Sequence, residues 1–193
     1  MSKDKVITAI DIGTSKIVTV IAQALDEGSI NVLGVSVTPA RGMRKGQIID
    51  IDEVMQAVNA SVDGAERMAG YSVAQVFVSI GGIHIESQNS RGVVAVAEPD
   101  REIGPSDIER VMDAARAVSI PTSREILHVI PRNFIVDGHE GVKDPIGMTG
   151  VRLEVDTHII TGSSALIRNL VKTVEEIGVD VAVRGGPDDA RVQ

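Results

Sequence analysis

The chain has 193 residues, 43% of them hydrophobic, and a formal net charge of -8 at pH 7. That length and hydrophobic content allow one medium domain or two small ones with buried cores. The acidic balance and the 2% aromatic content argue against nucleic acid as a partner, because such surfaces need basic stripes and stacking platforms. The absence of cysteine excludes disulfides, thiolate zinc sites and a cysteine nucleophile, and it fits a reducing compartment.

The residues before Val6 are not followed by the apolar stretch and small-residue cleavage site of a secretory signal. The sequence also holds no apolar run of the ~18 residues that a membrane-spanning helix requires. These features predict a cytoplasmic protein.

Two β-rich runs lie within residues 6–22, the second of them over Ile17–Ala22, and they flank a polar turn. Gly13 lets the backbone approach an anion, and the N–H groups of the turn can donate to phosphate oxygens together with Thr14, Ser15 and Lys16. Asp11, at the end of the first run, is placed to face a metal such as Mg²⁺, directly or through water. The segment therefore predicts a site for the phosphates of a nucleotide, with Asp11 facing the metal.

An ordinary β-hairpin with a glycine turn is the alternative interpretation of this segment. The turn is not a Walker A loop, because the residues after it predict a strand rather than a helix, and it is not a Rossmann fingerprint. A phosphate turn between two antiparallel strands resembles the first phosphate loop of the superfamily of actin, sugar kinases and heat-shock chaperones.

The next elements predict a mixed sheet with a helix packed on it. Ile30–Val37 reads as a third strand, and the loop 38–46, with three basic residues, is either a solvated connection or an anion contact. A helix capped by Asp50 or Asp52 ends at Gly70, with apolar residues at three- and four-residue spacing. A strand over 73–80 then stops at two glycines, 81 and 82.

A second, small α+β unit follows from residue 83 onward. A polar stretch leads into a strand over 93–96, and Ser106 with Glu109 predicts a capping box for a helix that runs to Val118. Strands are expected over 125–136 and 151–160, separated by a loop. A last helix opens at 161–164, where N-capping by serine and a second anion site are both possible readings, and it closes at Gly178. We expect 181–193 to be a disordered tail.

Other catalytic patterns are missing from the sequence. His84, His128, His139 and His158 stand far apart and lack paired metal-ligand spacing, so no zinc site is expected. No serine sits in a G-x-S-x-G pattern, which leaves an α/β-hydrolase unsupported. No catalytic residue is predicted, and any phosphoryl chemistry would depend on the phosphate turn.

Several short motifs, in the right order, resemble the FtsA family of bacterial cell-division proteins. The first group comprises Ala9-Ile-Asp-Ile-Gly-Thr-Ser-Lys16, Leu33-Gly-Val-Ser36, Gly42 and Lys45-Gly46. The second group, which is closer, comprises Arg101-Glu-Ile103, Ser106-Asp-Ile108, Arg124-Glu-Ile-Leu-His-Val-Ile-Pro131, Phe134-Ile-Val-Asp-Gly138, Asp144-Pro-Ile-Gly-Met148, Arg152-Leu-Glu-Val155 and His158-Ile-Ile-Thr-Gly162. The resemblance covers about 6–180.

The resemblance implies a fold of class α+β or α/β. It implies an actin-like, ribonuclease-H-like subdomain 1A over 1–82 and 162–180, built on a mixed sheet and incomplete. It further implies an inserted SHS2-type subdomain 1C over 83–161. The second lobe and the C-terminal membrane helix of the family have no counterpart in this sequence, which predicts an N-terminal portion of the family's protein.

The function implied by the resemblance is that of an actin-like, ATP-binding protein of the division septum, which links the FtsZ ring to the membrane and to later division proteins. Its location would be the cytoplasmic face of the inner membrane, reached through the missing helix. FtsZ would meet the missing lobe, whereas subdomain 1C would contact other FtsA subunits and later division proteins. The family would bind ATP with Mg²⁺ through Asp11, Gly13, Thr14, Ser15 and Lys16. Without the second lobe, we expect weak or no ATP binding by this chain.

Two alternatives come from the same superfamily: a fragment of a sugar- or acetate-kinase-like phosphotransferase, and a fragment of a pilus-assembly ATPase-like protein. The order of the motifs from Arg101 to Gly162 argues against the kinase. The run that ends at Met148 favours FtsA over the pilus protein. The choice rests on resemblance, because a fold alone does not specify a function.

Overall fold

The computed structural model describes residues 5–25, 29–96 and 102–182. Within these residues the chain forms two compact units. Unit 1 consists of the described parts of Met1–His84 and Ser163–Arg184, and unit 2 of the described parts of Ile85–Gly162. Among the helices of the described residues, none is both long enough and apolar enough to cross a membrane.

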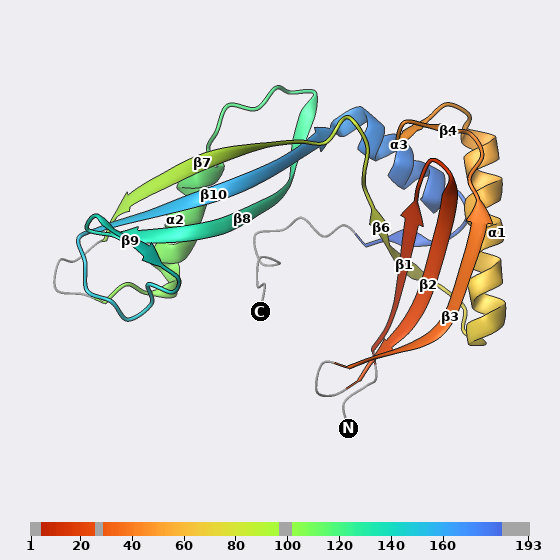
Figure 1. Ribbon diagram of the computed structural model, residues 1–193, viewed down its shortest axis with the longest axis horizontal. Helices are drawn as coiled ribbons and strands as arrows, with labels where there is room; N and C mark the ends of the chain where they lie inside the picture. The colour runs from red at the N-terminus through yellow and green to blue at the C-terminus, as the bar shows by residue number, and fades with distance from the viewer. Residues whose placement is uncertain (1–4, 26–28, 97–101, 183–193) are drawn as a thin grey trace. The chain divides into compact units, whose positions relative to one another are not determined.

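Unit 1 is built on a mixed five-stranded sheet with the order β11-β6-β1-β2-β3 (Figure 1). β1 pairs antiparallel with β2, and β2 pairs antiparallel with β3, whereas β6 is parallel to both β1 and β11. Both the predicted antiparallel hairpin and the predicted mixed sheet are therefore confirmed. The strands are β1 (Lys5–Ile12), β2 (Lys16–Ala24), β3 (Ile30–Pro39), β6 (Gln75–Ser79) and β11 (Asp180–Val181).

Two helices, α1 (Ile51–Ala69) and α3 (Ser164–Glu175), share one hydrophobic core with this sheet. The predicted ends of α1 are confirmed, because Asp50 Oδ1 accepts a hydrogen bond from Glu53 N at 3.0 Å and Gly70 closes the helix with a φ of 64°. Figure 1 shows α1 running alongside the strands β1 to β3. The core includes Ile10, Ile17, Ile21, Val54, Val58, Val62, Val76 and Val174.

A polar contact lies inside this apolar core, between β2 and α1. The hydroxyl oxygens of Thr19 and Ser61 are 2.8 Å apart, and both side chains have an exposed fraction of 0%. Close to it, a Cβ built on Gly34 of β3 would overlap the carbonyl oxygen of Ala65 in α1. The glycine therefore lets α1 pack directly on the backbone of the edge strand.

A short hairpin begins within the predicted loop 38–46 and extends two residues beyond it. It consists of β4 (Met43–Arg44) and β5 (Gln47–Ile48), joined by Lys45 and Gly46 with φ values of 50° and 74°. Two successive residues with positive φ are typical of the tight turns that favour hairpins. Met43 and Ile48 pack against the core of unit 1 and so anchor the hairpin.

Unit 2 is a four-stranded sheet with the order β7-β10-β8-β9, covered on one face by α2 (Pro105–Arg116). Figure 1 shows β7, β10 and β8 running side by side, with α2 packed against them. The strands are β7 (Glu86–Ala95), β8 (Arg124–Val136), β9 (His139–Val142) and β10 (Arg152–Ser163). Its core includes Val111, Ala115, Phe134, Leu153, Val155 and Ile159.

Two predictions for unit 2 are wrong in detail. The helix begins at Pro105 rather than after a Ser106 cap, because the carboxylate of Asp107 accepts the N–H of Gly104 at 3.0 Å and Gly104 is the N-cap. The strand predicted over 93–96 begins earlier, because the polar stretch 86–91 is also part of β7, whose ladder with β10 pairs Glu86 with Thr161 at one end and Ala95 with Arg152 at the other. Polar residues fit this strand because one of its faces meets solvent.

The C-terminal region also differs from the predictions. β10 continues to Ser163, so the run 161–164 belongs mostly to a strand, and the hydroxyl of Ser163 makes no capping hydrogen bond at the start of α3. Val181, predicted as the first residue of the tail, pairs with Val76 of β6, and Ala182 N donates to Val76 O at 2.7 Å. The remainder of the predicted tail, 183–193, lies outside the described residues.

Candidate functional site

The turn between β1 and β2 is tightly closed. Gly13 N donates to Lys16 O at 3.0 Å, and a Cβ on Gly13 would lie only 2.9 Å from that same oxygen. Any other residue would have to shift the turn, since real Cβ atoms almost never come so close. The side chains of Thr14, Ser15 and Lys16 are exposed. The turn therefore offers bare backbone with two hydroxyls and an ammonium group to solvent.

Asp11 is held at the carboxyl end of β1 by a residue from the neighbouring parallel strand. Asp11 and Ser79 are register partners in the β1–β6 ladder, and the hydroxyl of Ser79 donates a hydrogen bond to Asp11 Oδ1. Parallel strands that end together place the residues after them at one sheet edge, where α/β proteins bind ligands. The exposed carboxylate of Asp11 is thus oriented at such an edge.

The tip of the β4–β5 hairpin reaches the same place. Gly46 N donates to Thr14 Oγ1 at 3.1 Å, which joins the hairpin to the turn after β1. A Cβ on Gly46 would lie 2.7 Å from Gly82 Cα and 2.9 Å from Gly81 O, so the tip is also pressed against the segment after β6. Three segments far apart in the sequence therefore meet, with glycine at the contact or next to it in each segment.

A pocket of about 820 Å³ opens between these segments, within the range of ~300–1,000 Å³ typical of small-molecule sites. Of the five predicted site residues, Asp11, Gly13 and Thr14 line it, whereas Ser15 and Lys16 do not. Residues that sequence reasoning did not assign to the site complete the lining. They include Lys45, Gly46, Ser79, Gly81 and Gly82.

The missed residues carried partial signals. The basic, glycine-containing loop 38–46 and the glycine pair after the strand over 73–80 are both visible in the sequence. Their convergence depends on the parallel pairing of β1 with β6, which local patterns do not reveal. The topology therefore supplies what the motif alone could not.

The pocket suits phosphate groups accompanied by one divalent cation. Glycine backbone without Cβ atoms and the hydroxyl of Thr14 can approach or donate to phosphate oxygens. Asp11 and Lys45 are the charged residues of the lining. Across the described part of the chain there is no cluster of three or more metal-ligating His, Cys, Asp or Glu side chains. A cation beside Asp11 would take its remaining ligands from water and phosphate, as Mg²⁺ commonly does.

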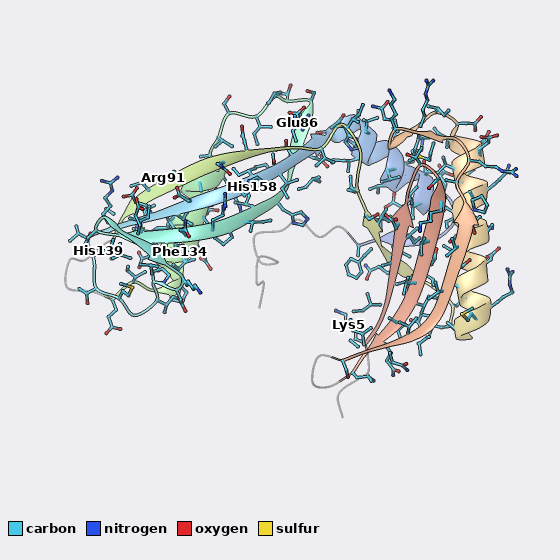
Figure 2. The ribbon with its side chains drawn as sticks, in the orientation of Figure 1. Lys5, Glu86, Arg91, Phe134, His139 and His158 are labelled. Atoms are coloured by element: carbon cyan, nitrogen blue, oxygen red, sulfur yellow. The ribbon has the colours of Figure 1, made fainter. Side chains whose placement is uncertain are left out.

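Three of the four histidines, His128, His139 and His158, belong to unit 2 and not to the unit that holds this pocket. Nδ1 of His158 lies 2.9 Å from the side-chain oxygen of Asn89, and Nδ1 of His139 lies 3.2 Å from the carbonyl oxygen of Val136. Figure 2 shows His158 on the long strands of unit 2 and His139 near their end. Each of these two rings therefore has a local structural partner.

Unit 2 presents a second candidate surface, the face of its sheet opposite α2. Arg91, labelled in Figure 2, lies on β7. It binds Asp156 of β10 through two hydrogen bonds, of 2.7 and 2.9 Å, and lies 3.7 Å from Glu154. The hydrogen bond with Asp156 is the main cause that raises the pKa of Arg91 above its usual value. Arg152 also contacts Glu154, at 3.2 Å, although the Glu154 side chain is only 8% exposed. The result is an ordered, charged face, and we call these four residues the charged cluster.

Comparisons with known proteins agree with this architecture. A family model described as "SHS2 domain inserted in FTSA" matches residues 82–161. The chain is 41% identical over 177 residues to the cell division protein FtsA of Pseudomonas aeruginosa. This match covers 92% of this chain and 42% of the relative. The FtsA proteins of Borreliella burgdorferi and Bacillus subtilis are 45% and 40% identical over 181 residues, covering 93% and 94% of this chain. The chain thus spans less than half the length of these relatives, 44% and 41% for the last two.

A solved structure shares the fold at much lower sequence identity. The PilM-PilN type IV pilus biogenesis complex contains a chain that matches with a TM-score of 0.61 and 10% identity, over 92% of this chain and 46% of that one. At this identity the likeness concerns the fold alone. Together with the SHS2 match, it confirms the predicted actin-like fold with an inserted α+β module.

Proposed function

Since the chain belongs to the FtsA family of cell-division proteins, we propose that it acts in bacterial cell division as an actin-like, ATP-binding protein. The proposal includes assembly at the septum on the cytoplasmic face of the membrane. There the full-length protein of the family would link the FtsZ ring to the membrane and to later division proteins, and this chain would supply part of it. The pocket of unit 1 would hold the nucleotide phosphates, and unit 2 would serve as an interaction module.

The observation that carries the nucleotide site is the convergence of three glycine-bearing segments around Asp11. Asp11, Gly13 and Thr14 line the pocket, and Ser15 and Lys16 stand exposed as the next residues of the same turn. Backbone N–H groups and the hydroxyls would bind the phosphates, and Asp11, oriented by Ser79, would face Mg²⁺ through its water shell. Bound ATP with Mg²⁺ would itself supply most of the charge in the site.

The expected affinity is low. The described lining supplies one ammonium group and one carboxylate, and the pocket is open to solvent. We therefore expect a dissociation constant of about 1 mM, which corresponds to ~4 kcal/mol of binding free energy. A method that detects weak binding is needed.

The test is a titration of the ¹⁵N-labelled chain with ATP, followed by NMR, with and without Mg²⁺. We expect the amides of Gly13 and Thr14 to shift saturably, and the Mg²⁺ dependence to disappear in Asp11→Asn, which keeps the side-chain shape. Asp113→Asn, on the exposed surface of α2 with a side chain 72% exposed, is the matched control. Unchanged Mg²⁺ dependence in Asp11→Asn would refute the role of this carboxylate.

The proposal for unit 2 concerns contacts with other copies and with later division proteins. It is supported by the charged cluster, in which Arg91 and Arg152 are exposed to solvent. Their ion pairs with Asp156 and Glu154 already order these side chains, which would therefore lose little entropy on binding. Charge reversal in Arg152→Glu should weaken self-association measured by analytical ultracentrifugation. Lys143→Glu, exposed in the loop after β9, is the control. Equal association of both variants would place the contact elsewhere.

A further inference from the structure

The position of a lysine on the β4–β5 hairpin has a consequence for how unit 1 would recognise phosphate. We infer that Lys45, more than Lys16, is the cation that binds the anionic phosphate chain in the pocket of unit 1. The inference rests on the proposed nucleotide site, and it concerns which residue supplies the positive charge there.

The first argument is placement. Lys45 lines the pocket together with Asp11, Gly13 and Thr14, whereas Lys16 does not, although Lys16 belongs to the phosphate turn itself. Lys45 is exposed, and within the described residues no ion pair engages its ammonium group. The ammonium group is therefore available to a ligand in the pocket.

The second argument is that the backbone fixes Lys45 at this position. The next residue, Gly46, donates its N–H to Thr14 Oγ1 at 3.1 Å, and its α-carbon is packed against Gly82. On the other side, Met43 and Ile48 anchor the hairpin strands in the core. A lysine at the tip of a hairpin held on three sides has less freedom to leave the pocket than one in a mobile loop.

The third argument is the charge of the lining. Asp11 alone would repel phosphate, so an anionic ligand needs a compensating cation nearby. Of the residues that line the pocket, Lys45 is the one with a positive charge. Lysine binds phosphate as a mobile point charge with three donors, which suits a ligand that approaches an open site.

The experiment compares three alanine variants in the NMR titration with inorganic tripolyphosphate and, separately, with ATP, both with Mg²⁺. Lys45→Ala should weaken binding of both ligands about tenfold or more, because it removes a charge-assisted hydrogen bond. Lys16→Ala should change binding by less than about threefold. Arg44→Ala removes the neighbouring positive charge of the same hairpin from a residue outside the lining, so it is the matched control. Lys45→Arg, which keeps the charge, should retain most of the affinity.

The outcomes separate the two proposals. Binding by the unaltered chain that survives in Lys45→Ala but is lost in Lys16→Ala would overturn the inference and leave the nucleotide site standing. A uniform loss in Lys45→Ala and Arg44→Ala would also overturn it, because the effect would then be one of general surface charge. If the unaltered chain shows no shifts at the pocket with millimolar ligand, the proposed nucleotide site fails, and the inference fails with it. Unperturbed amide spectra without ligand verify that each variant is folded.

Discussion

The buried hydrogen bond between Thr19 and Ser61 links β2 to α1, and its removal should destabilise unit 1. In Ser61→Ala, the hydroxyl of Thr19 stays in a fully buried environment without this partner. An unsatisfied buried hydroxyl costs about 1–3 kcal/mol, so we expect the free energy of unfolding of unit 1 to fall by about 2 kcal/mol. The loss of one oxygen atom adds only a small cavity.

A second substitution isolates the cause. Thr19→Val combined with Ser61→Ala replaces both hydroxyls and keeps nearly the same volume, and such paired replacement can be almost neutral. Thr19→Val alone should cost less than Ser61→Ala alone, because a serine inside a helix can turn its hydroxyl to a carbonyl of the preceding turn. The double variant should therefore be more stable than Ser61→Ala.

The assay is tyrosine fluorescence, which the composition of the chain restricts to unit 1. The chain has one tyrosine and no tryptophan, and Tyr71 follows directly after the C-cap of α1. Tyrosine fluorescence during urea unfolding therefore reports on unit 1 and not on unit 2. Gln56→Ala, at an exposed position of the same helix, is the control and should stay within about 0.5 kcal/mol of the original chain.

The reasoning would be refuted by additive effects. If Ser61→Ala costs under about 0.5 kcal/mol, or if the double variant loses the sum of the two single losses, the hydrogen bond has no coupling energy. The sheet and α1 would then be joined by apolar packing alone.

Three further predictions concern the site and the two cores. Ser79→Ala removes the hydrogen bond that orients the carboxylate of Asp11, which is proposed to face Mg²⁺. It should therefore weaken Mg²⁺-dependent ATP binding about threefold to tenfold without lowering stability by more than about 1 kcal/mol, as the NMR titration and urea unfolding can check. Gly34→Ala should destabilise unit 1 by about 1–3 kcal/mol, because the new methyl group meets α1, whereas Gly81→Ala, which has open space around it, should cost under about 0.5 kcal/mol in the same unfolding assay. Arg91→Ala should speed hydrogen exchange of the amides along β7 and β10, since it removes an ion-pair partner from a carboxylate that is only 8% exposed, and Arg132→Ala should not.

Much of the fold follows from local signals, and the exceptions have physical causes. Both ends of α1 were predictable because Asp50 and Gly70 stand at the two ends of a regular stripe of apolar residues. The start of α2 was not, because Ser106 and Glu109 fit a capping box, whereas the N-cap is Gly104, two residues earlier, and its N–H donates to the carboxylate of Asp107. The first part of β7 was missed because its polar residues face solvent and pair with β10, a partner far along the chain, whereas its apolar end was predicted as a strand over 93–96.

The candidate site shows the same division. The turn with Gly13 and Thr14 was visible in the sequence, as was the carboxylate of Asp11 before it. The contributions of Lys45 and Ser79 depend on tertiary contacts, namely the hairpin bond to Thr14 and the β1–β6 pairing. A motif can thus locate a site, whereas the residues that complete it come from segments that only the fold brings together.

The long ladder between β7 and β10 has a thermodynamic effect on unit 1. β11 can join the sheet of unit 1, and α3 can pack on its core, only after the chain has passed through the inserted residues 82–161. Closing an unstructured loop of about 80 residues costs roughly 2 kcal/mol more entropy than closing one of about eight. Once Glu86 is paired with Thr161, the entry and exit of unit 2 lie about one strand spacing apart, ~5 Å, so most of that loop is already closed. Pairing within the inserted module therefore lowers the entropy cost of completing unit 1. Substitutions that fray this ladder should loosen β11 and α3 as well.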